Sequence, residues 1–141
     1  MAVLDTNIII EIESENQKLE AALKKIIGQS TEKAYITSPT YSEFFYGVVD
    51  KPEPKQHKAL EFLDKFALLN TSKNSSRVLA NIKHKLEKAG KMIPIFDLFI
   101  ASIVMDNGAT LVTLDEHFKN IEGLKVIVIG QDYNIKESTK T

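Results

Sequence analysis

The sequence of 141 residues contains no cysteine, and this absence excludes several kinds of site. Disulfide bridges, thiolate sites of the zinc-finger kind and cysteine nucleophiles all require a thiol group. A chain of this length can bury most of its apolar surface in one core without such links. We therefore expect a fold that depends on its hydrophobic core, in a protein compatible with the reducing cytosol.

Long apolar runs are also missing. The stretch from Phe99 to Met105 is far shorter than the about 20 residues that a membrane-spanning helix needs. A secretory signal would combine a basic start with a long apolar run, whereas Asp5, Glu11 and Glu13 lie near the start of this chain. The sequence therefore predicts a cytoplasmic protein with no membrane partner.

Arginine is nearly absent, because Arg77 is the single arginine among 18 basic residues. Lysine is a point charge and lacks the planar fork with which arginine reads base edges. The formal net charge of −1 is not the basic surplus that nucleic-acid binders usually show, although it leaves room for a local basic patch. Any contact with nucleic acid should therefore be made mainly to phosphates.

The composition, with 43% hydrophobic and 26% charged residues, is typical of a soluble globular domain. The length fits one such domain. We expect the domain to cover residues 1–130 and to be followed by a polar C-terminal tail with few anchors, residues 131–141.

Short apolar runs alternate with amphipathic segments along this domain. Runs bounded by turn-forming residues predict strands, and apolar residues that recur every three or four positions predict helices. Strands are expected at residues 2–4, 33–37, 110–113 and 125–129, and helices from residue 8, at 16–28, from 38 to about 49, around 60–66, at 72–90 and at about 97–107. This alternation predicts an α/β fold with a central parallel β-sheet flanked by helices.

Helix boundaries can be placed from capping residues. Ser38 followed by Pro39 predicts an N-cap with proline at the first helical position. Gly28 and Gly90 predict the ends of two amphipathic helices.

Four acidic residues occupy positions that share one rim in such a sheet. Asp5 and Asp115 come just after strands, whereas Glu43 and Asp97 lie in the first turns of helices. Ligands of open parallel sheets collect beyond the carboxyl ends of the strands, so these side chains can converge there. Crowded carboxylates repel one another, and such a cluster persists at neutral pH chiefly when a divalent cation occupies it. The pattern favours Mg²⁺ or Mn²⁺ and hydrolysis by metal-activated water.

Each of these acids also has a simpler explanation. Asp5 and Asp97 suit helix N-termini, and Glu43 and Asp115 can be solvated surface charges. Spacing alone does not single out these four among the 19 acidic residues of the chain. On pattern alone, a metal site is one interpretation among several.

The four acids lie in four segments that follow one another along the chain. The segments are Val3-Leu4-Asp5-Thr6-Asn7-Ile8, Ser42-Glu43 with Gly47, residues 93–102 around Asp97, and Leu111-Val112-Thr113-Leu114-Asp115 with Phe118. In this order and spacing they resemble the motifs of PIN-domain nucleases, and especially of the VapC-type toxins of toxin–antitoxin pairs. The resemblance spans nearly the whole chain.

This resemblance implies a PIN-like domain that cleaves RNA as an Mg²⁺- or Mn²⁺-dependent endoribonuclease. It makes the four acids the catalytic metal ligands. It also matches a set of polar positions that support the site in the family, namely Thr6, Asn7 and Thr113. Turn and cap roles explain these three residues at least as well. Where many relatives have a further acid near the last motif, this chain has His117, which favours one tightly held ion.

The resemblance further implies partners, namely an RNA substrate, an antitoxin protein and a second copy of the chain in a homodimer. Two apolar clusters are candidates for a surface that binds a partner, and core packing explains them equally well. They are Ile8, Ile9, Ile10 and Ile12, and Phe44, Phe45 and Tyr46.

A basic segment in the middle of the chain is a candidate for binding RNA phosphates. Its residues are Arg77, Lys83, Lys85, Lys88 and Lys91. A solvated helix face explains them as well. Two further acids near the motifs, Asp106 and Glu116, are expected to lie outside the site.

Other functions compete with a toxin ribonuclease. A haloacid-dehalogenase-like phosphatase requires a second aspartate two residues after the first, where this chain has Asn7. An RNA-processing PIN nuclease shares the same chemistry and differs only in its substrate and partners. A non-catalytic PIN module that binds RNA or protein is the third alternative, and the presence of all four acids argues against it.

Overall fold

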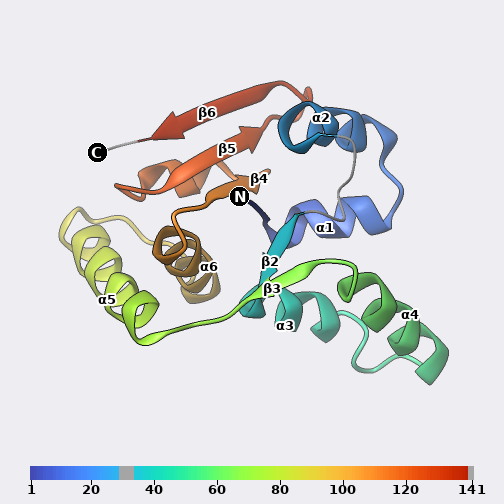
Figure 1. Ribbon diagram of the computed structural model, residues 1–141. Helices are drawn as coiled ribbons and strands as arrows, with labels where there is room; N and C mark the ends of the chain where they lie inside the picture. Colours follow the sequence, from blue (N-terminus) through green and yellow to red (C-terminus); the bar gives the residue numbers. More distant parts are fainter. Residues whose placement is uncertain (29–33, 140–141) are drawn as a thin grey trace.

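Strand β1 (Ala2–Leu4) lies inside a sheet of six strands in the computed structural model, which describes residues 1–28 and 34–139 (Figure 1). The strand order is β3-β2-β1-β4-β5-β6. The other strands are β2 (Tyr35–Thr37), β3 (Ala67–Leu69), β4 (Thr110–Thr113), β5 (Lys125–Ile129) and β6 (Ile135–Thr139). The first five strands in this order pair in parallel, which confirms the predicted α/β architecture.

The chain reverses its direction of winding between β1 and β4. It moves outward from β1 to β2 and β3, and then returns to build β4 and β5 on the other side of β1. Leu4 lies in register with Val112 across this pair, and the backbone N–H of Asp5 donates to the carbonyl of Val112 at 2.9 Å. In open parallel sheets, the crevice at such a reversal point is where ligands bind. The topology therefore marks the carboxyl ends of β1 and β4.

Helices cover both faces of the sheet (Figure 1). They are α1 (Thr6–Glu13), α2 (Gln17–Ile27), α3 (Ser38–Tyr46), α4 (Glu53–Leu63), α5 (Lys73–Lys88) and α6 (Ile95–Asp106), with a 3₁₀ helix η2 (Glu116–Asn120) after β4. Neighbouring residues of one strand point to opposite faces. Accordingly, Val3 and Leu111 pack in a core with α5 and α6, whereas Leu4 and Val112 pack in a second core with α1 and α2.

Several predicted helix boundaries need correction. The N-cap of α3 is Thr37, whose side chain accepts a hydrogen bond from the N–H of Thr40 at 3.3 Å, and Ser38 is already helical. Helix α3 also ends at Tyr46 rather than near residue 49. Thr37 is the last residue of β2, so the strand passes into the helix without a linker. Of the strand predicted at residues 33–37, residue 33 lies outside the described residues.

The expected C-terminal tail contains a strand instead. Residues 135–139 form β6, which pairs antiparallel with β5 from Lys125↔Thr139 to Ile129↔Ile135. Gly130 begins the connecting turn, in which its N–H donates to the carbonyl of Asn134 at 2.8 Å. The expectation of few anchors is therefore wrong for this segment, and the sheet is mixed rather than purely parallel. The segment is mainly polar, so its sequence has no apolar pattern that predicts a strand, and its pairing with β5 is made by the backbone.

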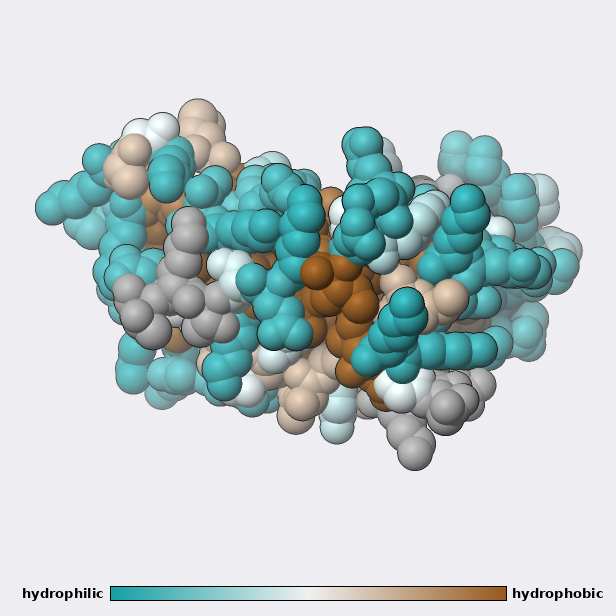
Figure 2. Space-filling view, turned by 90° about the horizontal axis from the view of Figure 1, so that it is seen from above, coloured by the Kyte–Doolittle hydropathy of each residue, from teal (hydrophilic) through white to brown (hydrophobic). Residues whose placement is uncertain are grey.

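Apolar residues that were candidates for a partner surface divide between core and surface. Ile8, Ile9 and Ile12 are buried in the core, whereas Ile10 is 46% exposed and Tyr46 is 79% exposed. The face shown in Figure 2 is mainly hydrophilic, with its apolar area near the middle. Among the described residues, no helix combines the length and apolar character needed to cross a bilayer.

Leu111 belongs to the hydrophobic core. It is fully buried in the central strand β4, and Leu111→Ala should lower the free energy of unfolding by about 2–5 kcal/mol, because it removes buried methyl groups and leaves a cavity. Leu68 lies on the edge strand β3 with 45% of its surface exposed, so Leu68→Ala should cost at most about 1 kcal/mol. Urea denaturation measures both, and equal losses would contradict the assigned core.

Candidate active site

Asp5 stands where β1 ends and α1 begins, and both of its carboxylate oxygens are engaged. Oδ1 accepts a hydrogen bond from the backbone N–H of Thr6 at 2.8 Å, which makes Asp5 the N-cap of α1. Oδ2 accepts from the hydroxyl of Thr113 at 2.7 Å. The residue is 4% exposed. The simpler explanation of Asp5 as a helix cap is therefore correct, and it coexists with a place in the acidic site.

Thr6 connects the first acid to the second. Its hydroxyl lies 2.7 Å from Oε1 of Glu43 and 3.1 Å from the hydroxyl oxygen of Thr40. A hydroxyl has one proton, and a carboxylate is the stronger acceptor, so Thr6 donates to Glu43 and the Thr40 hydroxyl is left to donate to Thr6. Thr40 is fully buried on α3, one helical turn before Glu43. This chain of hydroxyl groups fixes the carboxylate of Glu43 beside the start of α1.

Thr113 connects the first acid to the fourth. Its hydroxyl donates to Asp5 and accepts from the backbone N–H of Asp115 at 3.1 Å. Asn7 adds a second link, because its side-chain carbonyl accepts from the N–H of Leu114 at 3.3 Å and its amide lies 3.5 Å from the Thr113 hydroxyl. The three polar residues expected to support the site thus contact its acids or the adjacent strand end.

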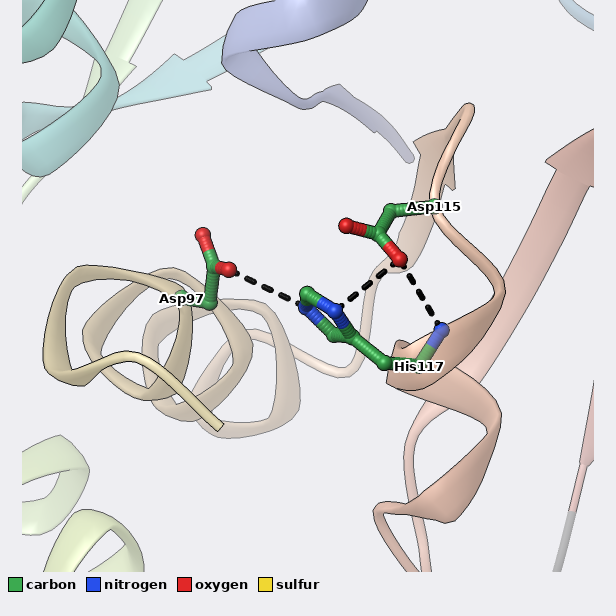
Figure 3. Close-up of side chains that lie close together, drawn as sticks. All are labelled: Asp97, Asp115 and His117. Atoms are coloured by element: carbon green, nitrogen blue, oxygen red, sulfur yellow. Dashed lines mark hydrogen bonds and ion pairs between the residues drawn. The ribbon is translucent and has the colours of Figure 1, made fainter. Parts of the chain in front are cut away.

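His117 lies between the third acid and the fourth (Figure 3). Its Nε2 is 3.0 Å from Oδ2 of Asp97, and its Nδ1 is 2.9 Å from Oδ1 of Asp115. Asp97 comes from the first turn of α6, whereas Asp115 and His117 come from the N-cap and second residue of η2. Among the residues that the structure describes, these three form the group of possible metal ligands whose atoms lie within 4.8 Å of one another.

The negative charges of the site act on one another. Burial raises the pKa of Asp5 to about 6, and the charges of Asp97 and Glu43 add to this rise, while the hydrogen bonds from Thr113 and Thr6 oppose it. Burial also raises the pKa of Asp97, with His117 opposing the rise and the charges of Glu43 and Asp115 adding to it. Burial is thus the main reason why the ionised forms of Asp5 and Asp97 are disfavoured, and the neighbouring carboxylates add to it.

The sign of the resulting pH dependence follows from the raised pKa of Asp5. The protonated carboxyl of Asp5 favours the folded state, so its contribution to stability is present at a pH below the ordinary pKa of 3.8 and is lost as the pH rises through about 6.

Within the described part of the chain, the ion pairs of the four site acids are those with His117, and lysine and arginine take no part in them. A bound cation would therefore suit the cluster at neutral pH.

The structure brings the four predicted acids into one electrostatic neighbourhood, but not into one tight cluster. Asp97 and Asp115 meet around His117, whereas Asp5 and Glu43 are held next to them by Thr113 and Thr6. Thr40 was missed by the sequence analysis. Thr40 lies three residues before Glu43 on the same side of a predicted helix, and this spacing could have indicated that the two side chains are close together. His117 was noted only as a replaced acid, and its contacts with two aspartates depend on the fold of η2.

The acids expected to lie outside the site do so. Asp106 is at the far end of α6 and accepts hydrogen bonds from Ser72 and Asn74. Glu116 is exposed and pairs with Lys119 and Lys136.

The basic segment lies on the exposed side of α5 and just beyond it. All five of its residues are exposed, and Lys83 pairs with Glu87 at 3.0 Å. The C-terminal part of α5 borders a surface hollow of about 480 Å³, lined also by Asn120 and Glu122 of the η2 region. Lys85 and Lys91 are the basic residues in this lining.

The segments that carry these acids lie within a match to a known family. Residues 2–124 match the family described as PIN domain. The chain belongs to the PIN-domain family. Among curated relatives, this PIN domain is 30% identical to Ribonuclease VapC2 of Haemophilus influenzae over 113 residues, which cover 79% of this chain and 83% of the relative. It is 32% identical to plasmid stability protein StbB of Pseudomonas syringae pv. tomato over 138 residues, or 90% and 96% of the two chains.

Solved structures support the same assignment. This PIN domain is similar to a chain in the crystal structure of VapBC2 from Rickettsia felis bound to a DNA fragment from its promoter, with a TM-score of 0.76 and 27% identity. The similarity covers 89% of this chain and 96% of that chain. The family resemblance inferred from the four sequence segments is therefore confirmed.

The hydrogen bond from Thr113 to Asp5 can be tested by titration. Because this bond lowers the pKa of Asp5 against the effect of burial, Thr113→Val should raise that pKa above the wild-type value of about 6. Carboxyl ¹³C NMR, recorded in EDTA, measures the titration of Asp5 directly. Thr110→Val, on the same strand, is the matched control and should leave it unchanged. A wild-type pKa near 4, or identical values in all three proteins, would contradict the described environment.

Proposed function

We propose that this PIN domain is a metal-dependent endoribonuclease that acts as the toxin of a toxin–antitoxin pair. The observation that carries the proposal is the meeting of Asp97, Asp115 and His117 at the reversal point of the sheet, beside the buried carboxylate of Asp5. The named VapC ribonucleases among the relatives, and the VapBC complexes among the similar structures, support RNA as the substrate and an antitoxin as the partner.

The donor set of the site fits a divalent cation. Carboxylate oxygens are the ligands that Mg²⁺ and Mn²⁺ prefer, and a cation would offset the charges of Asp97 and Glu43, which add to the effect of burial in raising the pKa of Asp5. We assign Asp5, Glu43, Asp97 and Asp115 to holding Mg²⁺ or Mn²⁺. When bound, the ion would neutralise the scissile phosphate, activate the attacking water and stabilise the departing oxygen.

The side chains around the acids hold them in place for this chemistry. Thr113 fixes one oxygen of Asp5, and Thr6 fixes one oxygen of Glu43. The Thr113 hydroxyl also accepts from the N–H of Asp115, so a single hydroxyl contacts the residues that follow two neighbouring strands, Asp5 after β1 and Asp115 after β4. Mutations that remove hydrogen bonds of this kind, which orient metal ligands, commonly lower metal affinity or activity by about 10- to 100-fold.

Asp97 is the best residue for testing the nuclease. Asp97→Asn should reduce cleavage of a mixed RNA pool by on the order of 100-fold or more, because it removes a charged ligand without changing the size of the side chain. Wild type should cut with Mn²⁺ or Mg²⁺ and should not cut with EDTA. Gel electrophoresis of end-labelled RNA measures the cleavage.

Asp106→Asn is the matched control, since it makes the same change at the opposite end of α6 and outside the site. It should retain full activity. Cleavage that survives Asp97→Asn would remove Asp97 from the mechanism. Metal-independent binding of RNA without any cleavage would favour a non-catalytic PIN module. Metal-dependent cleavage by a protein that binds no antitoxin would favour an RNA-processing nuclease.

We further propose that the exposed lysines of α5 bind RNA phosphates. Reversing Lys85 and Lys88 to glutamate should weaken RNA binding about 10-fold or more at low salt and less at high salt, because the contacts are electrostatic. The equivalent reversal of Lys24 and Lys25, which are exposed on α2, changes the net charge equally and should have a smaller effect. Fluorescence anisotropy with a catalytically inactive Asp97→Asn background measures both. Equal effects would assign the loss to net charge rather than to this face.

A further inference from the structure

The ring of His117 is held by one aspartate and presented to another. Oδ1 of Asp115 lies 2.9 Å from Nδ1 of the ring and also accepts from the backbone N–H of His117 at 3.1 Å. One carboxylate oxygen thus fixes both the backbone and the ring of the same residue. The next residue, Phe118, is fully buried, and its ring centroid lies 4.8 Å from that of His117. The imidazole is therefore held by Asp115 and lies next to a buried residue of the core.

The two contacts fix which ring nitrogen faces which aspartate, with Nδ1 toward Asp115 and Nε2 toward Asp97. A neutral imidazole has one donor nitrogen and one acceptor nitrogen. In the tautomer that donates its Nδ1 proton to Asp115, the lone pair of Nε2 faces Oδ2 of Asp97, an arrangement that a cation between the two atoms would stabilise (Figure 3). A carboxylate that orients a histidine through one nitrogen while the other nitrogen binds a metal is a common arrangement in metal sites.

The distance between Nε2 of His117 and Oδ2 of Asp97 fits two ligands of one ion. Nε2 of His117 and Oδ2 of Asp97 are 3.0 Å apart. Two donors at right angles around an ion, each about 2.1 Å from it, are separated by about 3.0 Å. Among the described residues, the side-chain contacts of Asp115 are made by Oδ1, and Figure 3 shows its other oxygen pointing toward the side of Asp97. An ion beside Asp97 would thus have oxygen and nitrogen donors.

We propose that Nε2 of His117 is a nitrogen ligand of the ion held on Asp97, and that this ligand shifts the site away from Mg²⁺ toward ions that accept nitrogen. The inference rests on the proposed metal-dependent function and adds the identity of one ligand. Mg²⁺ is a hard cation that prefers oxygen, whereas imidazole suits Ni²⁺, Zn²⁺ and Fe²⁺. An acid at position 117, as the resemblance leads us to expect in many relatives, would give an all-oxygen site instead.

The ring nitrogens of histidine provide a direct test. The chain has three histidines, and wild type labelled with ¹⁵N-histidine should give separate ring signals for His57, His84 and His117. Titration with Zn²⁺ should move the Nε2 signal of His117 to the position of a metal-bound nitrogen, while its Nδ1 stays protonated. His57 and His84 serve as internal controls for adventitious binding at the surface. The same titration of Asp97→Asn should leave the His117 signal unchanged.

Metal selectivity provides the second measurement. Isothermal titration calorimetry should give an affinity ratio of Ni²⁺ to Mg²⁺ that falls by about 10-fold or more in His117→Asp, because the variant exchanges nitrogen for oxygen. Circular dichroism checks that the variant is folded, and the NMR experiment needs no variant at residue 117.

The outcomes separate this inference from the proposed function. If wild type binds ions through Asp97, but Nε2 does not move and the selectivity ratio is unchanged in His117→Asp, the nitrogen ligand is refuted and the nuclease proposal stands. If wild type binds no divalent ion with an affinity that Asp97→Asn reduces, both the nitrogen ligand and the metal-dependent mechanism are refuted.

Discussion

The parallel pairing of β1 with β4 is the constraint on which the site depends. It joins residues more than 100 positions apart in sequence, and it brings the end of each strand to the same rim. The hydrogen bond of 2.7 Å from Thr113 to Asp5 spans this pair just beyond the last paired residues. Helix α3 then adds Glu43, and helix α6 adds Asp97. The 3₁₀ helix η2 adds His117 and its N-cap Asp115. The acids meet because the sheet reverses its winding at this position.

Charge is concentrated at this rim by the same packing. The backbone pairing that buries Asp5 also removes it from water, which raises its pKa to about 6, and the neighbouring carboxylates add to the effect. Threonine hydroxyl groups hold Asp5 and Glu43 without neutralising them, and the side-chain amide of Asn7 lies next to the hydroxyl of Thr113. The ring of His117 contacts two of these acids, Asp97 and Asp115. The site therefore combines rigid positions with unsatisfied negative charge, as a cation-binding site requires.

Much of the fold could be predicted because its helices and buried strands have clear periodicity. The strands at residues 110–113 and 125–129 were placed correctly, and Gly90 follows the end of α5 with a positive φ. Strand β6 was missed because edge strands are polar and gain their pairing from the backbone, which leaves no apolar pattern. The four acids were identified by motif resemblance. Their grouping, with Asp97 and Asp115 joined by His117, depends on side-chain directions at helix starts that spacing does not encode.

The capping role of Asp5 restricts which amino acid can occupy its position. An N-cap needs a short side chain that reaches the first backbone N–H groups of the helix, as those of aspartate, asparagine, serine and threonine do. A metal-binding rim needs a negative charge at the same point. Asparagine would keep the start of α1 and lose the charge, whereas glutamate would keep the charge on a side chain too long to cap. Aspartate is the one residue type that meets both demands, so helix initiation and the proposed ion binding would share a single carboxylate.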